Sequence, residues 1–128
     1  MKRLLVPLLA AIALPTAVNA ELKGRQLEFS KRSVAFEVLA IAQCHENAGN
    51  MTSKEANLFA IKELKNNRYY SISNPKKYLS NRKVKKAAKK LSNVYKEKNV
   101  NCYSKAERDQ AEKEKGGYFS SHIFDILM

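Results

Sequence analysis

The pattern of apolar and polar positions predicts a series of helices separated by short polar breaks. Residues 29–47 are good helix formers, and within residues 34–44 only Glu37 and Gln43 are strongly polar. Apolar positions that run all round a helix indicate a central helix, and this stretch is too short to span a bilayer. The segment Ala48-Gly49-Asn50 then supplies residues that tolerate the left-handed conformation in which helices end.

A second, amphipathic helix is expected directly afterwards. Thr52 followed three residues later by Glu55 is the signature of a capping box. Apolar residues then recur at helical spacing and define the face expected to be buried: Leu58, Ile61 and Leu64. The helix should end near residues 66–67, and Phe59 falls off the apolar stripe.

The next segment poses the question of one helix or two. Residues 69–73 suit a short extended piece, and Asn74-Pro75 suits either the start of a helix or a turn. At about 100° per residue, one side of a helix from residue 81 onward collects the apolar residues Val84, Ala87, Ala88, Leu91, Val94 and Tyr95. Tyr78 and Leu79 fall on the opposite side, so we expect a break near residues 80–81, where the third main helix begins.

The C-terminal part predicts one more short helix and an apolar end segment. Ser104 and Glu107 form a second capping-box pattern, and Gly116-Gly117 should end that helix after Lys115. The segment from Tyr118 to the C-terminus is rich in apolar residues, namely Ile123, Phe124, Ile126, Leu127 and Met128. We expect it to pack on the core, because an exposed tail of this kind would promote aggregation. With no sustained alternating pattern, the sequence predicts a small all-α domain of three to five helices.

The first twenty residues have the features of an export signal. Lys2 and Arg3 precede an apolar run over residues 4–14, and Val18-Asn19-Ala20 supplies small residues for cleavage. A retained membrane anchor needs about 20 apolar residues, and this run is shorter. We therefore expect a cleaved signal peptide at residues 1–20 and a single helical domain at residues 21–128.

The segment MKRLLVPLLAAIALPTAVNA resembles the leader shared by many small uncharacterised exported proteins of marine picocyanobacteria. The resemblance covers the signal peptide only, so it implies a location and a lineage but carries no activity. The implied location is the periplasm or the outside of the cell.

Charge is unevenly distributed along the 128 residues of the chain. Residues 21–67 contain seven basic and six acidic residues, and residues 103–128 contain four basic and five acidic residues. Residues 68–102 contain eleven basic residues and one acidic residue, which leaves a net charge of +10. Most of these basic residues project from the side of the third helix opposite its apolar face, or lie just before it: Lys76, Lys77, Arg82, Lys83, Lys85, Lys86, Lys89, Lys90 and Lys96.

This concentration of lysine has two explanations. Like charges four residues apart on a helix, such as Lys85/Lys89 and Lys86/Lys90, repel each other, and a partner with negative charge would relieve the repulsion. Candidate partners are an anionic membrane surface, lipopolysaccharide, an acidic polysaccharide, nucleic acid or an acidic protein. The other explanation is a solvated face that binds nothing specific. Lysine suits diffuse attraction better than the bidentate recognition of phosphate by arginine.

Three tyrosines and two cysteines add to this picture. Tyr69, Tyr70 and Tyr78 lie beside basic residues, where they would either stack on bases or sugars or form the rim of the core. Cys44 and Cys102 are expected to form a disulfide in an exported chain, although two buried thiols or intermolecular pairing would also satisfy the sequence.

No recognised catalytic or cofactor-binding motif is present. His45 adjoins Cys44, but helix neighbours point about 100° apart, which is a poor geometry for a thiol–imidazole pair. His45 suits the end of a helix, where its cationic form meets the negative end of the dipole. With His122 distant in sequence, no metal site is predicted. We expect a non-enzymatic protein without cofactor that binds polyanions, with docking of a partner through the apolar C-terminal segment as the alternative.

Overall fold

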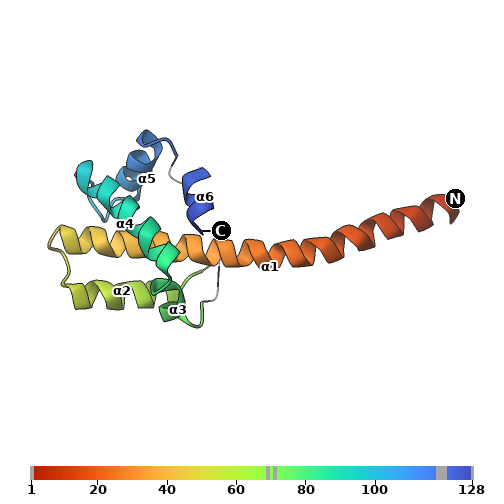
Figure 1. Ribbon diagram of the computed structural model, residues 1–128, viewed down its shortest axis with the longest axis horizontal. Helices are drawn as coiled ribbons and strands as arrows, with labels where there is room; N and C mark the ends of the chain where they lie inside the picture. Colours follow the sequence, from red (N-terminus) through yellow and green to blue (C-terminus); the bar gives the residue numbers. More distant parts are fainter. Residues whose placement is uncertain (1, 69, 71, 118–120, 128) are drawn as a thin grey trace. The chain divides into compact units, whose positions relative to one another are not determined.

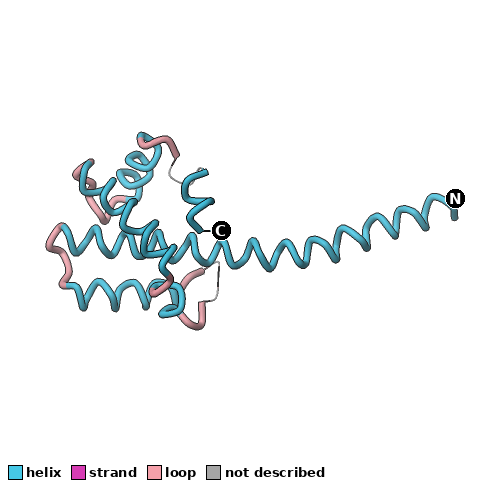
Figure 2. Tube along the Cα trace, viewed as in Figure 1, coloured by secondary structure: helices cyan, strands magenta, loops and turns pink. Residues whose placement is uncertain are grey.

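The computed structural model consists of helices joined by short connections (Figures 1 and 2). It describes residues 2–68, 70, 72–117 and 121–127, with side chains from residue 24 onward except at 121 and 122. The chain divides into two units, Met1–Ser30 and Lys31–Met128, each considered by itself. No strand occurs in the residues that the structure describes, which confirms the all-α class expected from the sequence.

Helix α1 spans Lys2–Asn47, and its last third is the central helix of the second unit. Every residue of α1 from 31 to 45 is buried or half-buried, as the apolar pattern predicted. The helix ends in a Schellman motif, in which the N–H of Asn50 donates to the carbonyl of His45 at 2.8 Å. Gly49 adopts a φ of 77°, the left-handed conformation that this motif requires.

Helix α2 spans Ser53–Lys65 and lies alongside the last part of α1 (Figure 1). Its predicted capping box is confirmed, since Thr52 and Glu55 each accept a hydrogen bond from the other's backbone N–H, at 3.2 and 3.1 Å. The buried residues of α2 are Ala56, Ala60 and Leu64. The prediction for Leu58 was wrong, because this side chain is 56% exposed. Alanine allows helices to approach closely, so the alanine side of α2 faces α1.

Helices α3 (Pro75–Leu79) and α4 (Arg82–Glu97) are separated at the expected break. Asn81 caps α4, and its Oδ1 accepts hydrogen bonds from the N–H groups of Lys83 and Val84 at 2.9 and 3.2 Å. The buried face of α4 consists of the six predicted residues and Ser92. Tyr78 and Leu79 are buried from α3 instead, which a continuous straight helix would prevent.

A disulfide joins the C-terminal end of α1 to the loop that follows α4. Helix α4 closes with a second Schellman motif, in which the N–H of Val100 donates to the carbonyl of Tyr95 at 3.0 Å and Asn99 adopts a φ of 51°. The chain then reaches Cys102, whose sulfur lies 2.02 Å from that of Cys44. The expected pairing is therefore confirmed, and neither cysteine is free.

Helix α5 spans Lys105–Glu114 and begins with half of the predicted capping box. The hydroxyl of Ser104 accepts from the N–H of Glu107 at 3.3 Å. The Glu107 carboxylate instead accepts from the N–H of Asn101 at 2.6 Å, so it fixes the preceding loop rather than its own N-cap. The helix ends at the glycine pair as expected, with φ values of 83° and 69° at Gly116 and Gly117.

Helix α6, Ser121–Leu127, packs against α4. Ile123 and Leu127 are 1% and 0% exposed, and Arg32 of α1 donates from Nη1 to the carbonyl of Leu127 at 2.7 Å. The expectation that the C-terminal segment packs on the core is thus confirmed for residues 121–127, whereas Tyr118 and Met128 lie outside the described residues. The described part of the chain holds six helices, one more than expected, because this segment is itself helical.

Candidate functional site

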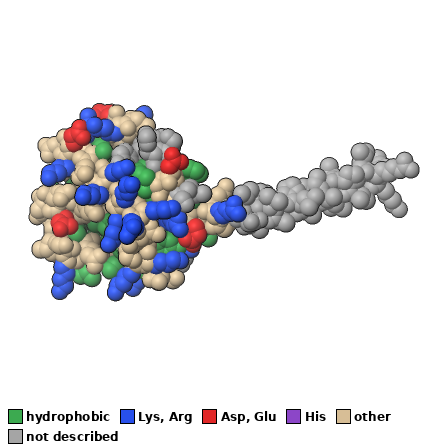
Figure 3. All heavy atoms as spheres, viewed as in Figure 1, with side chains coloured by type: hydrophobic (Ala, Val, Ile, Leu, Met, Phe, Trp, Pro, Cys, Tyr) green, Lys and Arg blue, Asp and Glu red, His purple; other side chains and the backbone are tan. Residues whose placement is uncertain are grey.

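The seven basic residues of α4 expected opposite its apolar side are exposed, and so are Lys76 and Lys77 on the preceding helix α3. We define the basic face as nine side chains of α3 and α4, all of them exposed: Lys76, Lys77, Arg82, Lys83, Lys85, Lys86, Lys89, Lys90 and Lys96. Their direction follows from packing, because the opposite side of α4 is buried in the core. In Figure 3, Lys and Arg side chains spread over the part of the surface where α4 lies.

The basic face has no internal neutralisation among the residues described. Three ion pairs lie within the described residues, and none includes a member of the face: Lys98–Glu114, Lys105–Asp109 and Lys115–Glu97. No acidic residue occurs in the first turn of α4 either. Lys77 alone has a recorded partner, since its Nζ lies 5.5 Å from the centre of the Tyr78 ring. The positive charge of this face is therefore directed to solvent.

The exposed side of α4 presents two rows of basic residues. Residues four apart lie one above the other, which places Arg82, Lys86 and Lys90 in the first row. The second row contains Lys85, Lys89 and Lys96. With a rise of 1.5 Å per residue, the face extends for about 21 Å along the helix. These rows lie on the side of α4 opposite its buried residues, so they project away from the core.

Tyr78, one of the tyrosines near this face, is not available for stacking. Tyr78 is 6% exposed and belongs to the core, which confirms the structural explanation for that residue. Tyr70 is half-buried, and Tyr69 lies outside the described residues. The basic face thus offers charge without an exposed aromatic ring on α3 or α4, where Tyr78 and Tyr95 are both buried.

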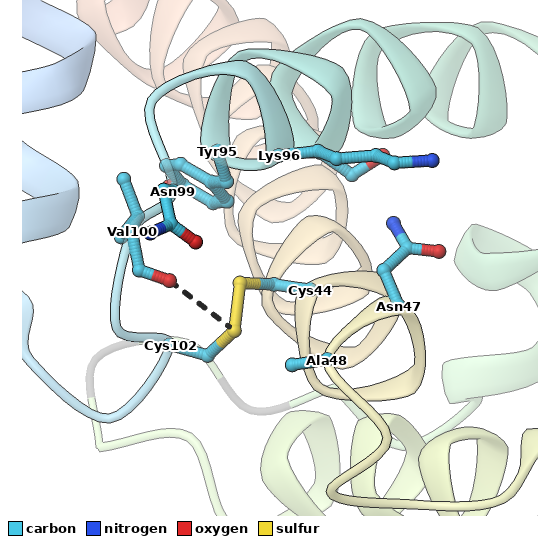
Figure 4. A pocket seen from close by; sticks show the side chains of 9 residues that line it. Cys44, Asn47, Ala48, Tyr95, Lys96, Asn99, Val100 and Cys102 are labelled. Atoms are coloured by element: carbon cyan, nitrogen blue, oxygen red, sulfur yellow. Dashed lines mark hydrogen bonds between the residues drawn. A yellow bond between two sulfur atoms is a disulfide. The ribbon is translucent and has the colours of Figure 1, made fainter.

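A small cavity lies where the disulfide links α1 to the loop after α4. Its volume is about 110 Å³, and Figure 4 shows the sulfur–sulfur bond between Cys44 of α1 and Cys102 in the loop after α4, with Asn47 and Lys96 together on one side. Lys96 is the one member of the basic face that lines it. A space of this size holds a few waters, and its sulfurs are already bonded to each other, so the cavity provides no thiol nucleophile.

His45 is a core residue rather than a cationic helix cap. It is 3% exposed, its ring lies 4.5 Å from that of Tyr103 between centroids, and its Nδ1 lies 3.2 Å from Nδ2 of Asn50. Burial, together with the positive charge of Arg108, lowers the pKa of His45. The expectation of a favourable cationic histidine was therefore wrong, because loss of water opposes the charged form more than the helix dipole favours it.

A cluster that sequence analysis missed, formed by the buried Glu112, the half-buried Glu37 and Tyr95, lies at the junction of α1, α4 and α5. The hydroxyl of Tyr95 donates to Oε1 of Glu112 at 2.5 Å. Burial raises the pKa of Glu112, and burial together with the negative charge of Glu112 raises the pKa of Glu37. Burial and the bond to Glu112 likewise raise the pKa of Tyr95. Arg108 lies close enough to moderate both carboxyl groups.

Raised carboxyl pKa values also occur in active sites, but this cluster lies apart from three hollows of the described surface. Neither Glu37 nor Glu112 lines the cavity at the disulfide, the hollow between the end of α4 and α5, or the hollow between α1 and α2. The sequence signal that could have revealed the cluster is Glu112 beside Ala111 on the inward side of α5.

The described residues lack the features of a metal site and of a membrane-spanning helix. They contain no group of three or more His, Cys, Asp or Glu side chains that could hold a metal ion. The helices in this part of the chain include none with the length and apolar character needed to cross a bilayer. Of the two histidines, His45 is described above, and the side chain of His122 lies outside the described residues.

Comparison of the chain with protein-family models, curated proteins and solved structures finds no match. The basic face is therefore interpreted from its own geometry and charge.

Proposed function

We propose that the protein is an exported, non-enzymatic binding protein whose basic face attaches it to polyanionic surfaces. The observation that carries the proposal is the exposure of nine cationic side chains without a carboxylate partner among the described residues. Binding would be electrostatic and weakly selective, because lysine is a compact, strongly hydrated charge rather than a planar bidentate donor.

Two further features support this proposal. The repulsion among lysines four residues apart on α4 costs stability that a bound polyanion would recover. The Cys44–Cys102 disulfide supports an oxidising location such as the periplasm or the cell exterior, as does the expected leader at residues 1–20.

The alternative hypothesis assigned partner docking to the apolar C-terminal segment. In the structure, Ile123 and Leu127 are buried and Phe124 is 49% exposed. The two buried side chains pack within the fold, so they are not available to a partner in this conformation.

Heparin retention tests the proposal. The variant Lys85→Gln/Lys86→Gln/Lys89→Gln/Lys90→Gln removes four charges from the basic face. We expect the unsubstituted protein to bind a heparin column at low salt and to elute as the ionic strength rises through about 0.15 M, where the Debye length falls to about 8 Å. The variant should elute far earlier.

The matched control removes four exposed lysines elsewhere, by Lys54→Gln/Lys62→Gln/Lys65→Gln/Lys113→Gln. It should elute close to the unsubstituted protein, although its net charge equals that of the first variant. Equal retention of the two variants would refute a dedicated face, and retention indifferent to salt would refute electrostatic attachment. Failure of the unsubstituted protein to bind would leave a solubilising surface as the explanation.

A further inference from the structure

We infer that the polyanion bound by the basic face is the plane of anionic headgroups of a lipid bilayer, on which the protein lies without inserting. The inference rests on the proposed function and adds a partner to it. It follows from the arrangement of the charges on α4 and from the packing of every large apolar side chain on that helix.

The arrangement of basic residues in two rows distinguishes a linear polyanion from a planar anionic surface. The row Arg82, Lys86, Lys90 and the row Lys85, Lys89, Lys96 lie side by side on the exposed half of α4. A linear polyanion that runs along the helix lies over one row, whereas a planar array of negative charge contacts both rows.

Lipid headgroups also suit basic residues that project away from the core. Both rows of α4 lie opposite its buried side, where a flat surface can reach them. Stacking of bases needs exposed aromatic rings, and Tyr78 and Tyr95 of α3 and α4 are buried. Anionic lipids diffuse in the bilayer and can gather beneath both rows.

The structure excludes insertion by α4. An amphipathic helix that inserts must free its apolar face, whereas Val84, Leu91 and Tyr95 of α4 are at most 1% exposed inside the fold. The exposed large apolar residues in the described part are Leu27, Leu58, Tyr103 and Phe124, and none belongs to α3 or α4. Attachment should therefore be peripheral and reversed by salt.

Vesicle binding by row variants tests this inference, with protein purified after export and its N-terminus determined by mass spectrometry. The variants are Arg82→Gln/Lys86→Gln/Lys90→Gln and Lys85→Gln/Lys89→Gln/Lys96→Gln, with Lys54→Gln/Lys62→Gln/Lys65→Gln as a control that removes three charges from α2. Co-sedimentation is measured with vesicles of phosphatidylcholine alone or mixed with increasing fractions of phosphatidylglycerol.

The unsubstituted protein should bind in proportion to the phosphatidylglycerol content, release an encapsulated dye no faster than buffer, and dissociate in high salt. Each lysine near an anionic surface contributes roughly fivefold to partitioning, so each row variant should bind about a hundredfold more weakly, and the α2 control should bind nearly normally.

Loss of vesicle binding in one row variant alone would show that a single row meets the bilayer, and would overturn the inference that both rows lie on it. Retention on heparin without vesicle binding would overturn it while leaving the proposed function in place. Loss of both would refute the proposed function as well, and dye release that depends on the basic face would refute flat attachment. Circular dichroism of each variant checks that a loss of binding is not a loss of folding.

Discussion

At the scale of single residues, the hydrogen bond between Tyr95 and Glu112 shows how the interior accommodates an acid. Glu112 is 8% exposed, and its Oε1 accepts from the Tyr95 hydroxyl at 2.5 Å. No buried side-chain nitrogen or oxygen in the described residues lacks a hydrogen-bond partner. A buried acceptor without its donor would bear the full cost of lost hydration.

The substitution Tyr95→Phe should therefore be destabilising. It removes only the hydroxyl and leaves the Glu112 carboxyl without that donor, which we expect to lower the free energy of unfolding by about 1–3 kcal/mol in urea titrations. Tyr103 is 71% exposed, and Tyr103→Phe is the control, expected to change stability by less than about 0.5 kcal/mol. Equal effects of the two substitutions would show that the buried bond contributes nothing.

Because the pKa of Glu37 is raised, the substitution Glu37→Gln should increase the free energy of unfolding by an amount that depends on pH. A carboxyl group whose pKa is higher in the folded than in the unfolded state loses stability as the pH rises from the unfolded value, about 4.3, through the folded value. Glutamine does not ionise. The variant should thus unfold at a higher urea concentration than the unsubstituted protein at pH 7. The difference between the two urea midpoints should become smaller toward pH 4.

Two comparisons make that result specific. The lowered pKa of His45 acts in the opposite sense, with stability lost as the pH falls through about 6.5, but both proteins contain His45 and the effect cancels in the difference. Glu46→Gln, on the exposed side of the same helix, is the matched control. If the stability difference between Glu37→Gln and the unsubstituted protein did not change with pH, the pKa of Glu37 would not be raised by burial and by Glu112.

At the scale of elements, α4 combines a well-packed apolar face with an exposed face that repels itself. Lys86 lies four residues after Arg82 and four before Lys90, so it participates in two like-charge pairs. A stabilising helix sequence would alternate charges there. The excess of lysine is therefore a local conflict of the kind found at functional surfaces.

The substitution Lys86→Glu should stabilise the protein and weaken its attachment to polyanions. It converts two repulsive pairs into attractive ones, which we expect to add about 1 kcal/mol to the free energy of unfolding at low salt and less in high salt. Heparin elution should shift to lower salt in the same variant. A loss of stability at low salt would contradict the absence of neutralising groups around Lys86.

The helix positions could largely be predicted from the sequence, because caps and periodicity are local signals. The break at residues 80–81 followed from the angular positions of Tyr78 and Leu79, and the pairing of two cysteines needed no geometry. The buried face of α2 was misjudged because alanine carries little hydrophobic signal, although it determines how closely helices pack.

The candidate site likewise has a part that could be predicted from the sequence and a part that could not. The basic face was predictable, since its members lie on one helix and the segment before it. The acid cluster was not, because Glu37, Tyr95 and Glu112 come from α1, α4 and α5 and only tertiary packing brings them together. The neutral tendency of His45 likewise depends on burial by distant residues, which include Tyr103.

At the scale of the second unit, the disulfide is expected to be a major source of stability. Cys44 and Cys102 are 58 positions apart, and the chain-entropy model assigns a loop of that length about 4 kcal/mol. The double variant Cys44→Ser/Cys102→Ser should lose stability of that order in urea titrations. Reduction of the unsubstituted protein under denaturing conditions, followed by alkylation, should give the same loss and serves as the control for the serine hydroxyls.

The same bond has a consequence for how the protein survives proteolysis. All of α2, α3 and α4 lies between the two bridged cysteines, so backbone hydrolysis at any one place in that interval, such as the exposed Arg68, leaves both fragments covalently joined. On a denaturing gel, a molecule cut once in this interval would separate into two bands only after treatment with a reducing agent. The lysine-bearing helix would stay tethered to α1 despite the cut.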